Sequence, residues 1–471
     1  MIERFVLLSP VDPTMRQYSP PRFRLLVKLC IVIGLAGLVS TQAQATSPFQ
    51  SGFRACARPL PDDEIRQLEQ RQKDLDRQIQ DARARDLTTM RDASQPLRAW
   101  IEEQLRIAER LECHRLTSLR DPIERAPGKE IRFLEVAIPF ATDRLPDFEQ
   151  AALPTAQRKP ELKFTGIVDQ SFREFSFGIA RVTIPTLRSP GDLNLPKWWQ
   201  WLDRRNPERF FQLLDIVDLQ RADLEATLTD PSKNPANTLL LFVHGFNVTF
   251  AEATMRLAQL AHDLSFPGQV LLYSWPSIGD VDAYFADEDT VRISAPRFQQ
   301  LLHDLTRMKI ERIFVIAHSM GARLAIPAII DVRARSSRPN AISELILAAA
   351  DFNQIEFRGL TTAFEKMSND GAGVTLYASS NDFALAASAL VHRYPRLGEG
   401  GEALFLSSGI DSIDATNSAS MRRAFGHSYI SDSPPVLGDL QDLLLHRFRP
   451  AQRGLAPIPA RGQGAWQFPG Q

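Results

Sequence analysis

Residues 313–323 read Ile-Phe-Val-Ile-Ala-His-Ser-Met-Gly-Ala-Arg, and the rest of the predicted fold can be built outward from them. The first four residues are apolar and mostly β-branched, which is typical of a parallel strand buried on both faces. A helical pattern of apolar residues follows through Leu324, Ile326 and Ala328. The frame between strand and helix, small-x-Ser-x-Gly, is the pattern of a nucleophile elbow, with Ala317 where a glycine usually stands.

In such an elbow the chain turns sharply, and we expect Ser319 at its tip with a positive φ. Small residues two before and two after the serine, Ala317 and Gly321, let the strand and the helix pass closely. A serine hydroxyl becomes a nucleophile once a base removes its proton. The pattern therefore predicts that Ser319 is a catalytic nucleophile; the alternative is a chance match in an ordinary strand-to-helix turn.

Apolar strands and helical patterns alternate from Thr238 onward, which predicts βαβ units and a parallel sheet. The five strand patterns lie at 239–243, 270–273, 313–316, 345–349 and 374–377. Three earlier patterns, at 131–140, 175–184 and 211–219, have few helices between them and predict an antiparallel edge. We also expect a strand near 403–406 and a last helix over 436–445. The predicted class is α/β, with a mostly parallel central sheet and antiparallel N-terminal strands.

Composition narrows the possible partners. The chain has 471 residues, 44% of them hydrophobic, and a net charge of -1. This balance is typical of a globular protein and gives no support for a nucleic-acid partner. The histidines are dispersed and no cysteine pair has metal-ligand spacing, so the sequence predicts no metal and no cofactor.

The N-terminus has the pattern of a targeting segment. Arg22, Arg24 and Lys28 form a basic region, and residues 29–39 form an apolar core of signal-peptide length. The Ala-Gln-Ala triplet at 43–45 fits a cleavage site. We therefore expect a signal peptide over residues 1–45 and export to the periplasm or the exterior, the alternative being an uncleaved membrane anchor.

Residues 46–128 predict a helical hairpin, in coiled-coil-like spacing, before the main domain at 129–449. Cys56 and Cys113 flank the helical patterns, so a disulfide between them is one expectation, and two buried, unpaired cysteines are the other. The apolar stripe of the hairpin needs a partner, which is the main domain, a second copy of the chain or another envelope protein. Residues 450–471, rich in Pro, Gly, Ala and Gln, predict a disordered tail.

The candidate base must be one of the histidines that follow the serine, because doubly wound hydrolases present serine, acid and histidine in that order. Beyond the elbow only His392, His427 and His446 remain. His427 stands in the loop between the last predicted strand and the last predicted helix, at the carboxyl edge of the sheet where such sites lie. We therefore predict His427 as the base.

Two carboxylates compete for the role of acid. Asp382 follows the strand 374–377, and Asp351 follows the strand 345–349. We prefer Asp382, with Asp351 as the alternative acid; each could instead only cap the helix that follows it.

Two backbone N–H groups are candidates for the oxyanion hole. That of Met320 comes directly after the nucleophile. That of Phe246 follows His244 and Gly245 in the loop after the strand 239–243.

The motifs together resemble a known family. They are 140–144 (Phe-Ala-Thr-Asp-Arg), 241–247 (Leu-Phe-Val-His-Gly-Phe-Asn), 273–277 (Tyr-Ser-Trp-Pro-Ser), 317–321 (Ala-His-Ser-Met-Gly), 380–382 (Ser-Asn-Asp) and 427–429 (His-Ser-Tyr). From about Val136 to Leu445 the chain resembles an α/β-hydrolase family of unknown function within the esterase/lipase superfamily. The resemblance implies an α/β-hydrolase fold and a triad of Ser319, Asp382 and His427; it implies no substrate.

The sequence thus predicts a serine hydrolase that cleaves a small-molecule or lipid carboxylic ester through an acyl-enzyme intermediate. One alternative is an amide or peptide hydrolase, because the same triad serves both reactions. Another is a non-catalytic envelope scaffold that keeps a hydrolase-like domain and assembles through its hairpin.

Overall fold

The computed structural model describes residues 62–86, 103, 107, 132–154, 157–171, 175–195, 206–280, 283–418, 426–462 and 464–469. The predicted signal peptide, Cys56 and Cys113 lie outside the described residues.

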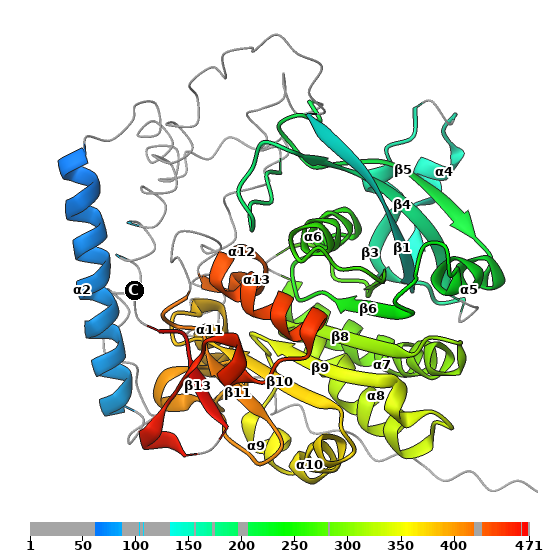
Figure 1. The fold of residues 1–471 in the computed structure, drawn as a ribbon. Coiled ribbons are helices and arrows are strands. Elements are labelled where there is room, and N and C mark those ends of the chain that lie inside the picture. Colours follow the sequence, from blue (N-terminus) through cyan, green and yellow to red (C-terminus); the bar gives the residue numbers. More distant parts are fainter. Residues whose placement is uncertain are drawn as a thin grey trace, which may run out of the picture.

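One sheet of eleven strands organises the molecule (Figure 1). From one edge to the other, its strands are β12 (Ala456–Pro457), β13 (Ala465–Gln467), β11 (Asp411–Asp414), β10 (Gly373–Ala378), β9 (Ile342–Ala348), β8 (Arg312–His318), β6 (Thr238–Val243), β7 (Gln269–Ser274), β1 (Phe133–Thr142), β4 (Ser176–Pro185) and β5 (Gln212–Leu219). A separate small sheet pairs β2 (Arg144–Pro146) with β3 (Phe164–Val168).

The large sheet is parallel in its centre and antiparallel at both edges. From β13 to β1 every adjacent pair of strands is parallel. Strand β4 then runs antiparallel to β1 and to β5, and β12 runs antiparallel to β13. The predicted α/β class, with a mostly parallel sheet and antiparallel N-terminal strands, is confirmed.

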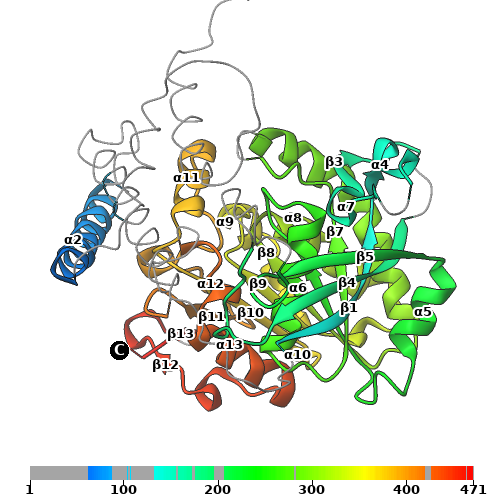
Figure 2. The same ribbon diagram turned by 90° about the horizontal axis from the view of Figure 1, so that it is seen from above.

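Helices cover both faces of the sheet, as the purely apolar strands require (Figures 1 and 2). In β6, Leu239, Leu241 and Val243 face one core, and Leu240 and Phe242 face the other. The first core is closed by α5 (Arg221–Thr229), α7 (Tyr284–Arg307), α8 (Ala322–Arg335), α9 (Gln354–Arg358) and α10 (Thr361–Asn369). The second is closed by α6 (Phe250–Asp263), α12 (Tyr429–Asp432) and α13 (Pro434–Gln441). Both faces of the sheet are therefore covered by apolar side chains.

The C-terminal segment corrects two of the predictions. The tail expected to be disordered instead places β12 and β13 on the edge of the sheet, where Ala465 and Phe468 are buried. The strand expected near 403–406 is absent from that described stretch, which holds a 3-10 turn (Gly401–Ala403) followed by irregular chain. The strand beside β10 is instead β11, whose sequence Asp-Ser-Ile-Asp has a single apolar residue.

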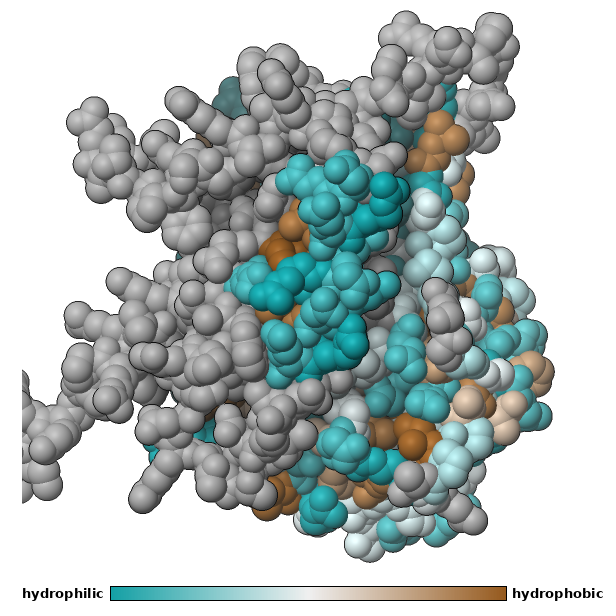
Figure 3. Space-filling model, turned by 90° about the vertical axis from the view of Figure 1, so that its left-hand side faces the viewer, coloured by the Kyte–Doolittle hydropathy of each residue, from teal (hydrophilic) through white to brown (hydrophobic). Residues whose placement is uncertain are grey.

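The N-terminal region is described mainly through α2 (Asp62–Asp86), which stands beside the body on the side of α11 (Phe383–His392) and β13 (Figures 1 and 2). Leu75 is buried against Ile107, and Arg71 forms an ion pair with Glu103. The outward surface of α2 is hydrophilic (Figure 3). The hairpin as a whole stays a prediction, since most of its second half lies outside the described residues. None of the helices in the described part of the chain combines the length and apolar character that a membrane span needs.

Candidate active site

The predicted elbow lies at the point where the strand order of the sheet reverses. Strands β7 and β8 flank β6 on opposite sides, and ligands of open α/β sheets bind at the carboxyl ends of the strands at such a point. Ser319 follows β8 directly, with a φ of 53°, as the elbow pattern predicts. A Cβ atom on Gly321 would lie 2.6 Å from the carbonyl oxygen of His244, which explains why a glycine stands there.

The structure brings the predicted base and the preferred acid together. The Nδ1 atom of His427 lies 2.9 and 2.8 Å from the two carboxylate oxygens of Asp382. Asp382 also caps α11, because its carboxylate accepts a hydrogen bond from the amide of Leu385 at 3.0 Å. The capping role and the role of partner to the histidine are thus compatible in one side chain.

This carboxylate sets the protonation of the imidazole. Burial by itself disfavours the charged ring, but the negative charge of Asp382 and its hydrogen bond outweigh burial, and Asp351 adds to the effect. The pKa of His427 is therefore raised above its ordinary value of 6.5. A stronger base than a free imidazole, held with one nitrogen toward an acid, leaves its other nitrogen to accept a proton.

His318 connects the elbow to the loop that carries the base. Its Nε2 lies 3.0 Å from the carbonyl oxygen of His427, and the two rings pack with their centroids 4.9 Å apart. Burial, with a smaller effect from the charge of His427, lowers the pKa of His318 to about 3. A neutral His318 with its proton on Nε2 donates to that carbonyl. The sequence placed His318 inside the elbow but gave no sign of this bond, which spans 109 positions.

The serine and the histidine are not joined in the same way. Among the hydrogen bonds of the described residues, none links the hydroxyl of Ser319 to the ring of His427. Such bonds are often long in an enzyme without substrate and shorten when substrate binds. The structure therefore unites the predicted acid and base, and it sets Ser319 at the elbow directly after His318, which contacts His427.

The loop after β6, which carries the predicted oxyanion donor Phe246, runs against the elbow. A Cβ atom on Gly245 would lie 2.8 Å from the Cβ of Ser319 and 3.0 Å from Nδ1 of His318, so only a glycine lets the backbone pass so close. The ring of Phe246 packs edge-on against Tyr284, with centroids 5.1 Å apart. The other predicted donor, Met320, is buried in the 3-10 turn that begins at Ser319.

Residues 220–447 match the model of a family described as alpha/beta hydrolase of unknown function (DUF900). This part of the chain is similar to that family. A search of curated proteins and a search of solved structures each found no match. The fold and the family agree with the resemblance drawn from the motifs, and the family sets no substrate specificity.

In this α/β-hydrolase domain the alternative acid, Asp351, has other partners, and none of the described hydrogen bonds or ion pairs joins it to His427. The carboxylate of Asp351 accepts hydrogen bonds from Tyr284 and Ser388, each at 2.6 Å, and pairs with Arg323 at 3.0 Å and Arg396 at 3.1 Å. Burial alone would raise its pKa, but the two guanidinium charges hold it at about 2.

Asp351 nevertheless supports the elbow. Its backbone N–H donates to the carbonyl of Ser319 at 3.1 Å, and Arg323 also binds its backbone oxygen. Asp351 therefore belongs to a buried hydrogen-bond network that contacts the elbow through the backbone carbonyl of Ser319.

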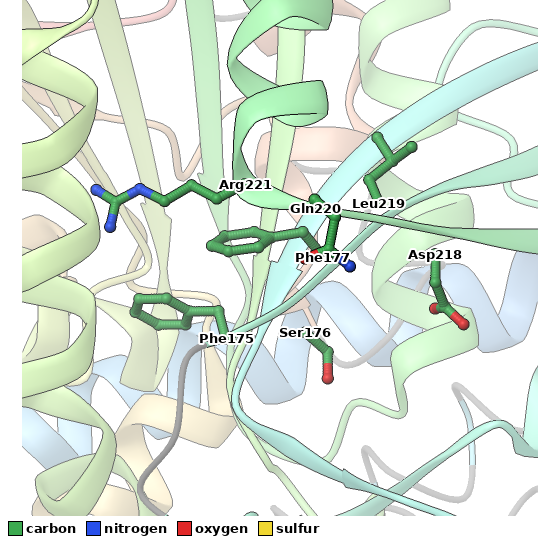
Figure 4. A pocket seen from close by; sticks show the side chains of 7 residues that line it. All are labelled: Phe175, Ser176, Phe177, Asp218, Leu219, Gln220 and Arg221. Atoms are coloured by element: carbon green, nitrogen blue, oxygen red, sulfur yellow. The ribbon is translucent and has the colours of Figure 1, made fainter.

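A shallow cavity of about 600 Å³ lies elsewhere in the domain (Figure 4). It is lined by Phe175, Ser176, Phe177, Asp218, Leu219, Gln220 and Arg221, at the ends of β4 and β5. Those strands are four and five places from β8, roughly 20 Å away at about 4.8 Å per strand. It contains none of the predicted site residues. Within the described part of the chain, no cluster of three or more His, Cys, Asp or Glu side chains is arranged to hold a metal ion.

Proposed function

We propose that the protein is a serine hydrolase that cleaves carboxylic esters through an acyl-enzyme intermediate. The observation that carries the proposal is the contact of His427 with Asp382 at the edge of the sheet where Ser319 adopts a positive φ. A non-glycine residue with a positive φ is strained, and such strain gathers at functional sites. A scaffold without catalysis has no need of a strained serine beside a histidine whose pKa is raised.

The proposed reaction begins when the hydroxyl of Ser319 attacks the ester carbonyl and its proton passes to Nε2 of His427. Asp382 stabilises the imidazolium that forms. The N–H groups of Phe246 and Met320 bind the oxygen that becomes negative. The imidazolium then protonates the departing alcohol, and water, deprotonated in turn by His427, releases the acid and restores the serine.

The kinetic test compares single and double variants on short and long acyl esters of p-nitrophenol. Ser319→Ala and His427→Ala should each lower kcat by several orders of magnitude, and the double variant should be little worse than either, because members of a triad act as a unit. Losses that add in the double variant would refute the assignment. Matched anilides test amide cleavage by the same residues, and an anilide cleaved faster than its ester would move the proposal to amidase chemistry.

A further inference from the structure

Arg144 is a buried arginine that the proposed reaction leaves without a role. Its exposed fraction is 1%, and among the described residues it forms no ion pair with a carboxylate. Burial lowers its pKa to about 10, against the opposing charges of Asp143 and Asp287, so the side chain remains a cation at neutral pH. Burying a cation is expensive unless its donors are satisfied. The hydrogen-bond partners of Arg144 therefore indicate which segments of the chain it holds in place.

Those partners lie on three segments that meet at the carboxyl edge of the sheet. Nε donates to Oγ of Ser274 at 2.9 Å, and one terminal nitrogen donates to the carbonyls of Thr165 at 3.1 Å and Ser277 at 2.8 Å. The other terminal nitrogen donates to the carbonyl of Val248 at 2.8 Å and lies 3.5 Å from Nε2 of His244. A guanidinium has five N–H donors in a rigid plane, and here every one of them points to a partner.

Two of these partners, His244 and Val248, are the two ends of the loop that holds Phe246. Two residues of the loop after β7, Trp275 and Ser277, also bind the ends of this loop. The indole N–H of Trp275 donates to the carbonyl of His244 at 2.8 Å, and the amide of Val248 donates to Oγ of Ser277 at 3.1 Å. The ring of His244 also stacks on Trp275. Arg144 thus lies between the loop after β7 and the loop after β6, and contacts both.

We propose that Arg144 is a positioning residue that fixes the loop 244–248, so that the N–H of Phe246 stays aimed at the developing oxyanion. This role rests on the proposed function. Arg144 touches no reacting atom and acts through the backbone of the loop 244–248. A displacement of about 1 Å in a group that stabilises a transition state can cost on the order of 100-fold in rate, so the anchor matters more for turnover than for substrate binding.

Arg144→Lys is the main variant, because one ammonium keeps the charge but cannot reach acceptors on three segments in one plane. We expect kcat to fall roughly 10- to 100-fold, somewhat less than the loss of a whole oxyanion donor, with KM little changed. The affinity of an alkyl boronic acid, whose tetrahedral serine adduct places an oxygen in the oxyanion hole, should fall with kcat. The affinity of an unreactive ketone of the same shape should not.

The matched control is Arg338→Lys. The guanidinium of Arg338 also binds two backbone carbonyls, those of Met308 and Ile310, but at the amino edge of the sheet. We expect the Arg338→Lys protein to be less stable than the wild type but to keep its kcat per folded molecule. Should Arg144→Lys fail to fold, Ser274→Ala is the deciding variant. It removes the Oγ that binds Nε of Arg144 and that also lies 3.3 Å from Nε2 of His244 in the same loop. We expect a smaller fall in kcat and in boronate affinity, with KM unchanged.

Normal kcat and boronate affinity in folded Arg144→Lys, or in Ser274→Ala where that variant alone folds, would overturn the positioning role while leaving the proposed function intact. Equal losses in Arg338→Lys would also overturn it, by showing that the effect is a general one on stability. A wild-type enzyme that neither cleaves esters nor binds the boronic acid would instead overturn the proposed function, and this role with it.

Discussion

At the residue scale, the pair of His427 and Asp382 predicts how activity depends on pH. A base must be neutral to accept a proton, and the pKa of His427 lies above its ordinary value of 6.5. We therefore expect kcat/KM to fall as the pH drops through an inflection that lies above 6.5. Rates measured from about pH 5 to 9 test this, and an inflection below 6.5 would contradict the account.

The contribution of His427 to the stability of the fold should change with pH in the opposite direction to the activity. A raised pKa means that the folded state holds the proton of His427 more tightly than the unfolded chain does. This contribution to stability is fully present below the unfolded pKa and is lost as the pH rises through the folded pKa. Chemical unfolding at each pH provides the control that separates loss of activity from loss of fold.

The two candidate acids predict different kinds of damage. Asp382→Asn can still cap α11 but no longer stabilises the imidazolium, so kcat should fall about 10⁴-fold with little change in stability. Asp351→Asn instead leaves Arg323 and Arg396 buried with a neutral partner. It should cost about 3–5 kcal/mol of unfolding free energy and spare most of the turnover of the folded fraction. The reverse pattern would move the role of acid to Asp351.

At the element scale, β13 protects the edge of the sheet. It pairs with β11, and Leu455 and Phe468 from the same segment are buried. A chain that ends at 449 would lack both side chains and would expose the apolar surface that they cover, at a cost of roughly 3–6 kcal/mol. It would also leave β11 as an open edge that promotes aggregation. Urea unfolding and light scattering of the shortened chain test this, and unchanged stability would contradict it.

How well the elements could be predicted depended on the range of the forces that form them. Strands β6 and β8 are apolar runs with local signals, and the turn between β8 and α8 has its own motif. Strand β11 has no local signal, since its sequence is Asp-Ser-Ile-Asp. Strand β13 is three residues long within a stretch of disorder-like composition, and it forms because β11 offers it an edge. Such strands depend on tertiary pairing, which composition does not record.

The candidate site likewise contains residues that could be predicted from the sequence and contacts that could not. The positions of Ser319, Asp382 and His427 follow from motifs and from the order of the strands. The contacts of Arg144 could not be predicted, because the residues it binds lie up to 133 positions away. The bond from His318 to the loop of His427 likewise exists only once the sheet has brought the two loops together.

At the scale of the whole molecule, the hydrolase domain should work without the N-terminal region. The described contacts of Leu75 are with other N-terminal residues, and none of the α2 side chains that the structure describes belongs to either core of the sheet. A chain that begins at residue 129 should therefore turn over a small soluble ester at nearly the wild-type rate. A large fall in kcat for the folded, shortened chain would show that the N-terminal region helps to form the site.

The central claim is that Ser319 is an activated nucleophile, and covalent labelling tests it most directly. Folded wild-type protein should react with a fluorophosphonate probe, and peptide mass spectrometry should locate one adduct on Ser319. Ser319→Ala should gain none, and Arg338→Lys should label as the wild type does. Folded wild-type protein that stays unlabelled, or an adduct on a different residue, would contradict the account.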